Sequence, residues 1–258
     1  MIQYRILETG CFYADGGAMF GAIPKRAWSR RYPSDEQNRC RLAMNCMLVW
    51  NQERIVLLDT GVGKKDLKNL SYYDFHNQED LVELIGSHGF KPEQITDVVL
   101  SHLHFDHCGG CTYTDDNGNL QLTFPKAKYW VSKPQWEEYM NPNDLEKDSF
   151  RPADMLPVLE SGSLRLVNDN FTLFDGFTIK LYDGHTKGQI VSFIETEDEY
   201  CLFPGDVFPT KAHLSDEWIS AYDIEPLESL ATKRKIKELI SDKKYSIIFY
   251  HDSNQLKL

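Results

Sequence analysis

Short apolar segments separated by turn residues recur along the whole chain, and this pattern predicts β-strands. In the N-terminal half, the predicted strands are residues 2–8, 42–50, 54–58, 97–100 and 127–131. In the C-terminal half, they are residues 163–167, 171–174, 177–182, 190–195, 200–203 and 245–250. The number and spacing of these segments indicate a protein with extensive β-sheet.

Three segments have the period of a helix instead. Residues 78–88 carry apolar side chains at helical spacing and end at Gly89. Ser132 and Gln135 fit a capping box that opens a helix to residue 140, and residues 227–240 form an amphipathic pattern. The mixture of helices and strands predicts an α/β protein.

Two segments lack a clear period. Residues 16–24 are rich in glycine and apolar side chains and are interpreted as a loop, whose Met19 and Phe20 either line a pocket or plug the core. Residues 141–162 combine prolines and charges with little periodicity, and strand signals resume afterwards. We therefore interpret residues 141–162 as a long excursion or lid over the domain.

Composition narrows the class of protein further. A length of 258 residues allows one large domain or two small ones, and the formal net charge of −11 argues against a nucleic-acid backbone or an anionic membrane as partner. The N-terminus lacks the pattern of a signal peptide and no apolar run is long enough to span a bilayer, so the expected location is the cytoplasm. The six cysteines are then expected to be free thiols, although the C-x-x-C spacing of Cys108 and Cys111 leaves a redox or zinc site open.

The chemistry is concentrated in the segment 101–110, which follows the apolar run Val98 to Leu100. His102, His104, Asp106 and His107 fall within six positions. Alternate residues of an extended chain point to the same side, so His102 and His104 are expected to face the same way as the chain leaves the sheet. Imidazole nitrogens together with a carboxylate suit zinc, or iron or manganese in a similar geometry.

Other polar residues share this position at the end of a strand, where a site is assembled from distant parts of a sequence. Seven such residues are His102, His104, His107, His185, His251, Asp59 and Asp206. Their shared position predicts one joint site. His76 and His88 receive no role, and His213 is interpreted as a surface histidine.

These residues form five ordered motifs: Asp59-Thr60-Gly61, His102 to His107, Gly184-His185-Thr186, Gly205-Asp206 and His251-Asp252. The series resembles the motifs of the metallo-β-lactamase superfamily. The resemblance implies a four-layer αββα sandwich in one domain over residues 1–258, with two mixed sheets, helices outside and two metal ions at one edge. It also implies that His102, His104 and His185 hold one metal, that Asp106, His107 and His251 hold the other, and that Asp206 bridges them. Asp59 would orient a ligand without binding metal itself.

Within the superfamily, the loop from Gly16 to Pro24 and the run from Gly205 to Thr210 resemble the quorum-quenching acyl-homoserine lactonases and the related organophosphate hydrolases. The apolar side chains of Phe20 in this loop and of Phe208 after Asp206 predict an apolar mouth at which both contact substrate. The chain departs from the lactonases after Asp206, where many have a substrate-contacting tyrosine and this chain has Phe208-Pro209.

The expected activity is hydrolysis of a lactone or ester by a hydroxide that bridges two divalent metals, with zinc favoured and iron, manganese or cobalt as alternatives. Asp106 is the candidate for carrying a proton to the leaving oxygen, or acts only as a ligand. A phosphotriesterase or phosphodiesterase, an iron-bearing oxidoreductase and a non-hydrolytic binding protein remain alternatives. The expected partner is a small-molecule substrate, without nucleic acid or membrane, and the sequence leaves open whether the protein forms a homodimer.

Overall fold

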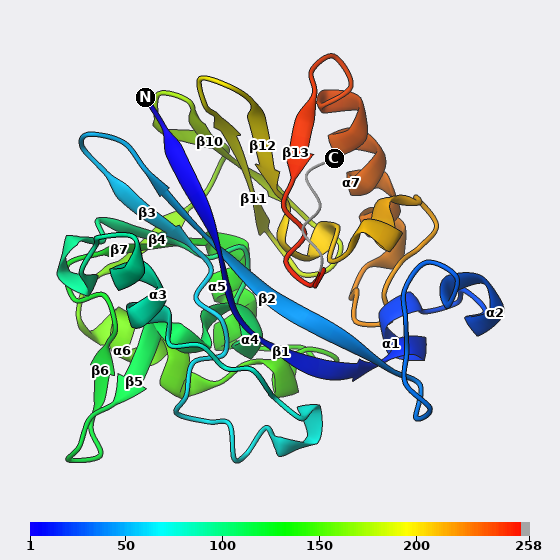
Figure 1. The fold of residues 1–258 in the computed structure, drawn as a ribbon, viewed down its shortest axis with the longest axis horizontal. Helices are drawn as coiled ribbons and strands as arrows, with labels where there is room; N and C mark the ends of the chain where they lie inside the picture. Colours follow the sequence, from blue (N-terminus) through cyan, green and yellow to red (C-terminus); the bar gives the residue numbers. More distant parts are fainter. Residues whose placement is uncertain (254–258) are drawn as a thin grey trace.

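Two mixed β-sheets face each other, with helices on their outer sides (Figure 1). The computed structural model describes residues 1–253. Within those residues, no helix is long and apolar enough to cross a membrane. The α/β class and the sandwich expected from the sequence are confirmed.

The first sheet has six strands, antiparallel on one side and parallel on the other. Two of its parallel strands, Ile55–Leu58 and Asp97–Val99, are buried on both faces, which explains their mainly apolar sequences. The first strand is longer than predicted, because a bulge between Glu8 and Cys11, with Gly10 at φ +139°, lets it bend and continue. In sheet order the strands are β1 (Gln3–Asp15), β2 (Arg39–Trp50), β3 (Ile55–Leu58), β4 (Asp97–Val99), β7 (Lys128–Ser132) and β8 (Leu164–Val167).

The second sheet has five strands, in the order β13 (Tyr245–Ile247), β12 (Tyr200–Phe203), β11 (Gln189–Glu195), β10 (Phe177–Tyr182) and β9 (Phe171–Phe174). The last strand is shorter than the predicted 245–250. Beyond it the chain crosses to the first sheet, where the amides of Asn45 and Ala43 donate to the carbonyls of Tyr250 and His251. This crossing brings His251 to the edge where β10 and β12 end.

The predicted helices are present as α3 (Leu81–Ser87), α5 (Lys133–Met140) and α7 (Pro226–Leu239). Ser132 caps α5 by accepting from the amide of Gln135. Ile236 of α7 packs against the second sheet, and α5 lies against β7 and β8.

The two segments without a clear period contain helices that the sequence did not predict. The expected loop 16–24 begins with α1 (Gly16–Phe20), which Asp15 caps, and α2 (Lys25–Trp28) follows it. The expected excursion 141–162 contains a 3-10 turn and α6 (Pro152–Glu160), which starts at a proline and buries Met155 and Val158. A helix of two or three turns with an internal proline gives too few periodic positions to be recognised.

The remaining elements are short. A hairpin pairs β5 (Thr112–Thr114) with β6 (Leu120–Leu122), and α4 (Phe105–Cys108) lies in the histidine-rich segment. The 3-10 turns are η1 (Ser71–Tyr73), η2 (Pro92–Gln94), η3 (Gly109–Cys111), η4 (Lys147–Ser149), η5 (Gly205–Val207) and η6 (Lys211–Leu214).

Candidate metal centre

The structure brings the seven candidate ligands to one edge of the two sheets. His102 follows β4, His104 precedes α4, and Asp106 and His107 lie in α4. From the second sheet come His185 after β10, Asp206 in η5 after β12, and His251 after β13. All seven side chains are buried.

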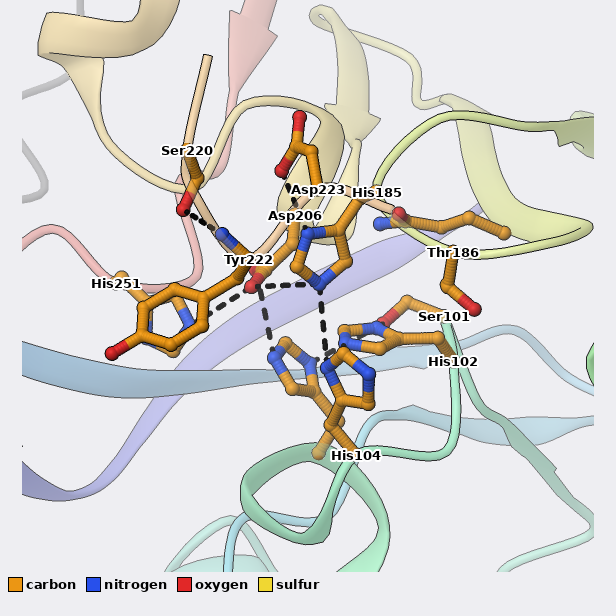
Figure 2. A network of polar contacts seen from close by, with 12 residues as sticks. Ser101, His102, His104, His185, Thr186, Asp206, Ser220, Tyr222, Asp223 and His251 are labelled. Atoms are coloured by element: carbon orange, nitrogen blue, oxygen red, sulfur yellow. Dashed lines mark hydrogen bonds and ion pairs between the residues drawn. The ribbon is translucent and has the colours of Figure 1, made fainter. Parts of the chain in front are cut away.

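Their donor atoms form overlapping groups of three. The donor atoms of His102, His104 and His185 lie within 4.8 Å of one another, as do those of Asp106, His107 and His251. A third group joins His102 and His107 to Asp206. The carboxylate of Asp206 lies between the first two groups: Oδ2 is 3.2 Å from Nε2 of His251 and 3.6 Å from Nε2 of His185 (Figure 2). The structure therefore brings together the residues of both expected triads, with the Asp206 carboxylate between them.

Four of the five rings are oriented from outside the cluster through Nδ1. The Nδ1–H groups of His107 and His185 donate to Asp59 at 2.8 Å and Asp223 at 3.0 Å, and that of His251 donates to the carbonyl of Ala43 at 2.8 Å. Ser101 Oγ donates its own proton to Asp59, so it accepts from Nδ1–H of His102 at 3.0 Å. Each of these rings therefore turns Nε2 toward the cluster.

His104 has the opposite orientation. Its Nδ1 lies 3.0 Å from Nε2 of His102 and 3.3 Å from Nε2 of His185, while its Nε2 is 3.0 Å from the carboxylate of Glu146. Figure 2 shows the rings of His102, His104 and His185 turned toward one another. Three ring nitrogens thus converge on one point.

The donor set fits divalent metal ions. Nε2 of His107 and Oδ1 of Asp206 are buried without a hydrogen-bond partner. A buried polar atom without a partner is rare and costly, and here both atoms face other ligand-type groups. A cation bound by imidazole nitrogen and carboxylate oxygen would satisfy these atoms together with the three converging nitrogens.

The electrostatics of the cluster also favour a cation. Burial lowers the pKa of His102 and His104, which keeps both rings neutral, as metal ligands must be. Burial alone would raise the pKa of Asp206, but His251 and His107 hold it well below its usual range. Burial would likewise lower the pKa of His107, but Asp106 and Asp206 raise it well above its usual value. These carboxylates therefore require positive charge beside them.

Asp59 supports the cluster from behind and belongs to none of the three groups of donor atoms found in the described part of the chain. It accepts from the amide and hydroxyl of Ser101 at 2.6 and 2.7 Å, and from Nδ1 of His107 at 2.8 Å. Its backbone is held in the left-handed region at φ 54°, which is unfavourable for aspartate and is found where surrounding contacts fix the chain. Its contacts are those of a residue that orients a ligand.

A glycine before Asp206 allows the two sheets to approach. Gly205 has φ +51°, and a Cβ atom there would lie 2.5 Å from the side-chain amide nitrogen of Gln189 and 2.7 Å from Cβ of Ser101. A larger residue would therefore push apart the segments that carry His102 and Asp206.

A cavity of about 70 Å³ opens beside the cluster. His104, Asp106, His185, Asp206 and His251 contribute to its polar side. Its other walls are mainly apolar or aromatic and include Phe12, Met19, Tyr73, Phe105, Leu145 and Tyr222.

Sequence reasoning missed several residues of this site. Ser101 contacts His102 and His107, Glu146 and Asp223 each contact one of the clustered histidines, and Tyr222 lines the cavity. Glu146 comes from the segment interpreted as a lid, so that segment does reach the site. Asp223 lies in a stretch without regular structure between η6 and α7, where no sequence signal marks it.

The expectation that Phe20 and Phe208 contact substrate is corrected. Both side chains are fully buried and neither lines the cavity. Phe20 stacks between Trp28 and His213, with ring centroids 4.9 Å away on each side, and Phe208 packs in the cluster beneath α7. Of the Met19–Phe20 pair, Met19 reaches the cavity and Phe20 plugs the core. An apolar residue beside a site motif has the same sequence signal in either role.

The interpretation of His213 as a surface residue is also wrong. Its ring, which comes from η6, is buried against Phe20, where Nδ1 lies 2.8 Å from Oγ1 of Thr210 and Nε2 donates to the carbonyl of Met19 at 2.9 Å. Burial lowers its pKa to about 4, so the ring is neutral at pH 7. His213 anchors the end of α1.

Phe20→Ala is therefore expected to destabilise the fold. Truncating a buried phenylalanine costs about 3–5 kcal/mol in the free energy of unfolding, which urea denaturation would measure. Leu227→Ala, at a side chain that is 82% exposed, is the control and should change little. Normal stability together with an altered KM in Phe20→Ala would contradict the structural role.

The six cysteines are all free and buried, as expected for thiols. Within residues 1–253, no cysteine belongs to a group of potential metal ligands. Burial raises the pKa of Cys108 and Cys111, which keeps both protonated and unreactive. Cys108 and Cys111 therefore serve as buried packing residues behind α4.

Taken together, the two facing sheets and the His/Asp cluster at their edge define a metallohydrolase of the αββα class. The sequence profile of the metallo-β-lactamase superfamily matches residues 41–251, and the chain belongs to this superfamily. It is similar to the N-acyl homoserine lactonase of Bacillus thuringiensis, with 25% identity over 224 residues and 82% of each chain covered.

Solved structures agree with this assignment. A probable metal-dependent hydrolase from Staphylococcus aureus superimposes with a TM-score of 0.90 and 29% identity, covering 98% of this chain and 90% of the other. The dizinc quorum-quenching lactonase AidC superimposes with a TM-score of 0.77 and 23% identity, covering 97% and 87% of the two chains. At that identity, the likeness to AidC shows the shared fold.

Proposed function

We propose that this protein is a dinuclear metal-dependent hydrolase that opens lactones or cleaves carboxylic esters of small molecules. The observation that carries the proposal is the pair of buried ligand triads with Asp206 between them, beside a cavity with apolar walls. The similarity to N-acyl homoserine lactonases supports the lactone as the first substrate class to test.

The residues of the cluster would have two roles, metal binding and proton transfer. Two divalent cations, when bound, would polarise a carbonyl and acidify water near neutral pH. His102, His104 and His185 would hold one of them and Asp106, His107 and His251 the other, with Asp206 shared. Asp106 lies on the cavity wall, and its carboxyl group would donate a proton to the alkoxide that leaves when the ester bond breaks.

The cavity walls favour an acyl or aryl group next to the reacting carbonyl. Phe12, Met19, Phe105 and Leu145 present apolar atoms beside the polar cluster. Each methylene that a substrate buries there contributes up to about 0.8 kcal/mol, so a few carbons change kcat/KM by tenfold or more. We therefore expect kcat/KM to rise with acyl-chain length.

The test combines metal analysis with a substrate panel. Purified protein should contain about two metal ions per chain, with zinc first in expectation, and N-acyl lactones of increasing length should be hydrolysed faster than aryl esters or phosphotriesters. A phosphotriester turned over faster than any lactone would replace this proposal with a phosphotriesterase on the same site. Tightly bound iron without hydrolysis of any of these substrates would favour an oxidoreductase.

A further inference from the structure

Glu146 is a buried carboxylate that reaches the metal centre from the segment between α5 and α6. Its side chain is only 2% exposed, and Oε1 lies 3.0 Å from Nε2 of His104. Among residues 1–253, Glu146 is the only carboxylate that forms a hydrogen bond with His104.

The position of this carboxylate is fixed by its own segment. The side-chain amide of Asn143 donates to Oε2 of Glu146 at 3.0 Å, and Oδ1 of Asn143 accepts from the backbone amide of Glu146 at 3.0 Å. Glu138 in turn accepts from the backbone amide of Asn143 at 2.8 Å. Glu146 is thus held from both its backbone and its second oxygen.

We infer that Glu146 is a positioning residue that makes His104 present Nδ1, and not Nε2, to a metal ion. An ionised carboxylate only accepts hydrogen bonds, so the proton of the neutral His104 ring must be on Nε2. The lone pair is then on Nδ1, which is the atom that faces His102 and His185. This inference rests on the metal site of the proposed function and adds to it a residue that the sequence motifs do not contain.

The use of Nδ1 explains how two histidines so close in sequence serve one ion. The rings of His102 and His104 have centroids 4.4 Å apart and planes at 78° to each other. Nδ1 lies nearer the backbone than Nε2, so the ring of His104 can reach Glu146 with Nε2 while its Nδ1 meets Nε2 of His102, where both would hold the same cation. Without Glu146, the His104 ring would lose the contact that fixes both its tautomer and its rotation.

Glu146 is not placed as a ligand itself. Among the described residues, it belongs to none of the groups of donor atoms that converge within 4.8 Å. Both of its oxygens already have partners, in His104 and Asn143. The His104 ring therefore lies between the Glu146 carboxylate and the point where the three ring nitrogens converge.

Cobalt-substituted protein provides the test, because protons on metal-bound histidines give strongly shifted NMR signals that disappear when they exchange rapidly with solvent. The wild-type protein should show a slowly exchanging Nε2–H signal from His104, sheltered by Glu146. Glu146→Met removes the acceptor while filling a similar volume, so this signal should be lost. Competition with a chelator should show that one of the two metal ions binds about 10- to 100-fold more weakly in Glu146→Met. Losses of this size are typical when a hydrogen-bond partner of a ligating histidine is removed.

Two further variants separate positioning from general damage. Glu146→Gln keeps an oxygen that accepts from Nε2–H, so it should retain the signal and most of the affinity. Asp144→Asn removes the same charge from the same segment at a side chain that is 95% exposed, and it should behave as wild type. If Glu146→Met does not fold, Glu146→Ala replaces it, with the same expected loss of the NMR signal and of metal affinity.

Two results would overturn the inference, and a third would overturn the proposed function on which it rests. Unchanged cobalt affinity and an unchanged exchangeable signal in Glu146→Met would show that His104 is positioned without Glu146. Loss of metal in Glu146→Gln as complete as in Glu146→Met would make the carboxylate a ligand. Failure of the wild-type protein to bind cobalt would instead remove the metal site of the proposed function, whatever the variants do.

Discussion

Asp206→Ala is expected to reduce activity to the level of chelator-treated wild-type protein and to lower the metal content below two ions per chain. Asp206 is the carboxylate placed between both histidine sets, with Oδ2 at 3.2 Å from His251 and 3.6 Å from His185, and Oδ1 at 3.5 Å from His107. Residues that only orient a ligand cost about 10- to 100-fold when removed, so a ligand shared by two ions should cost more than about 100-fold in kcat/KM.

Asp59→Ala is the matched control for this change, since it also removes a buried aspartate next to His107. Its carboxylate contacts Ser101 and His107 from behind, so its loss should cost about 10- to 100-fold while most metal remains bound. Metal analysis and thermal melting of both variants separate loss of ligand from loss of fold. If Asp59→Ala stripped the metals and Asp206→Ala did not, the two roles would be reversed.

Most strands of this fold are visible in the sequence because each is a short apolar run that turn residues interrupt. The parallel strands β3 and β4 are buried on both faces, which gives them continuous Val and Leu sequences. The boundaries are less predictable where tertiary contacts decide them. β13 stops at Ile247, because the following residues bond across to β2 instead of continuing beside β12 alone.

The helices that the sequence failed to predict are those whose stability comes from packing and not from a repeating pattern. α1 has five residues, and it is held by the Asp15 cap and by Phe20 stacked on His213. Helices this short are unstable alone, so their presence depends on neighbours that are distant in the sequence. The burial of Phe20 and His213 follows from the same contact, which no local pattern reveals.

The candidate ligands were predictable because each has a ligand-type side chain in a short segment that follows a strand. The ends of neighbouring strands lie at a common edge of the sheet, so residues that follow different strands come close together in space. The residues around the ligands were not predictable in this way. Glu146 lies in a stretch without a strand, and Asp223 meets His185 only because the chain after η6 folds back over β10. Only the tertiary structure brings Glu146 and Asp223 to the histidines that they contact.

Asp106→Asn is expected to separate proton transfer from metal binding. Asparagine keeps an oxygen that can bind a cation but cannot deliver a proton to a leaving oxygen. If Asp106 is the general acid, kcat for a lactone or alkyl ester should fall by about 100- to 10,000-fold, the usual contribution of such a group. The metal content should remain near that of the wild-type protein.

The leaving group decides between the two roles of Asp106. An alkoxide is strongly basic and must be protonated as it departs, whereas a nitrophenolate is stable as an anion and leaves without a proton. Loss of the general acid should therefore depress turnover of an alkyl ester far more than turnover of a nitrophenyl ester of the same acid. A ligand role predicts equal losses for both esters, together with weaker metal binding, because both substrates need the same cation. The activities of Asp106→Asn and Asp106→Ala toward the two esters therefore assign the function of this carboxylate. If Asp106 is the proton donor, Asp106→Asn should still hydrolyse the nitrophenyl ester while losing activity toward the alkyl ester.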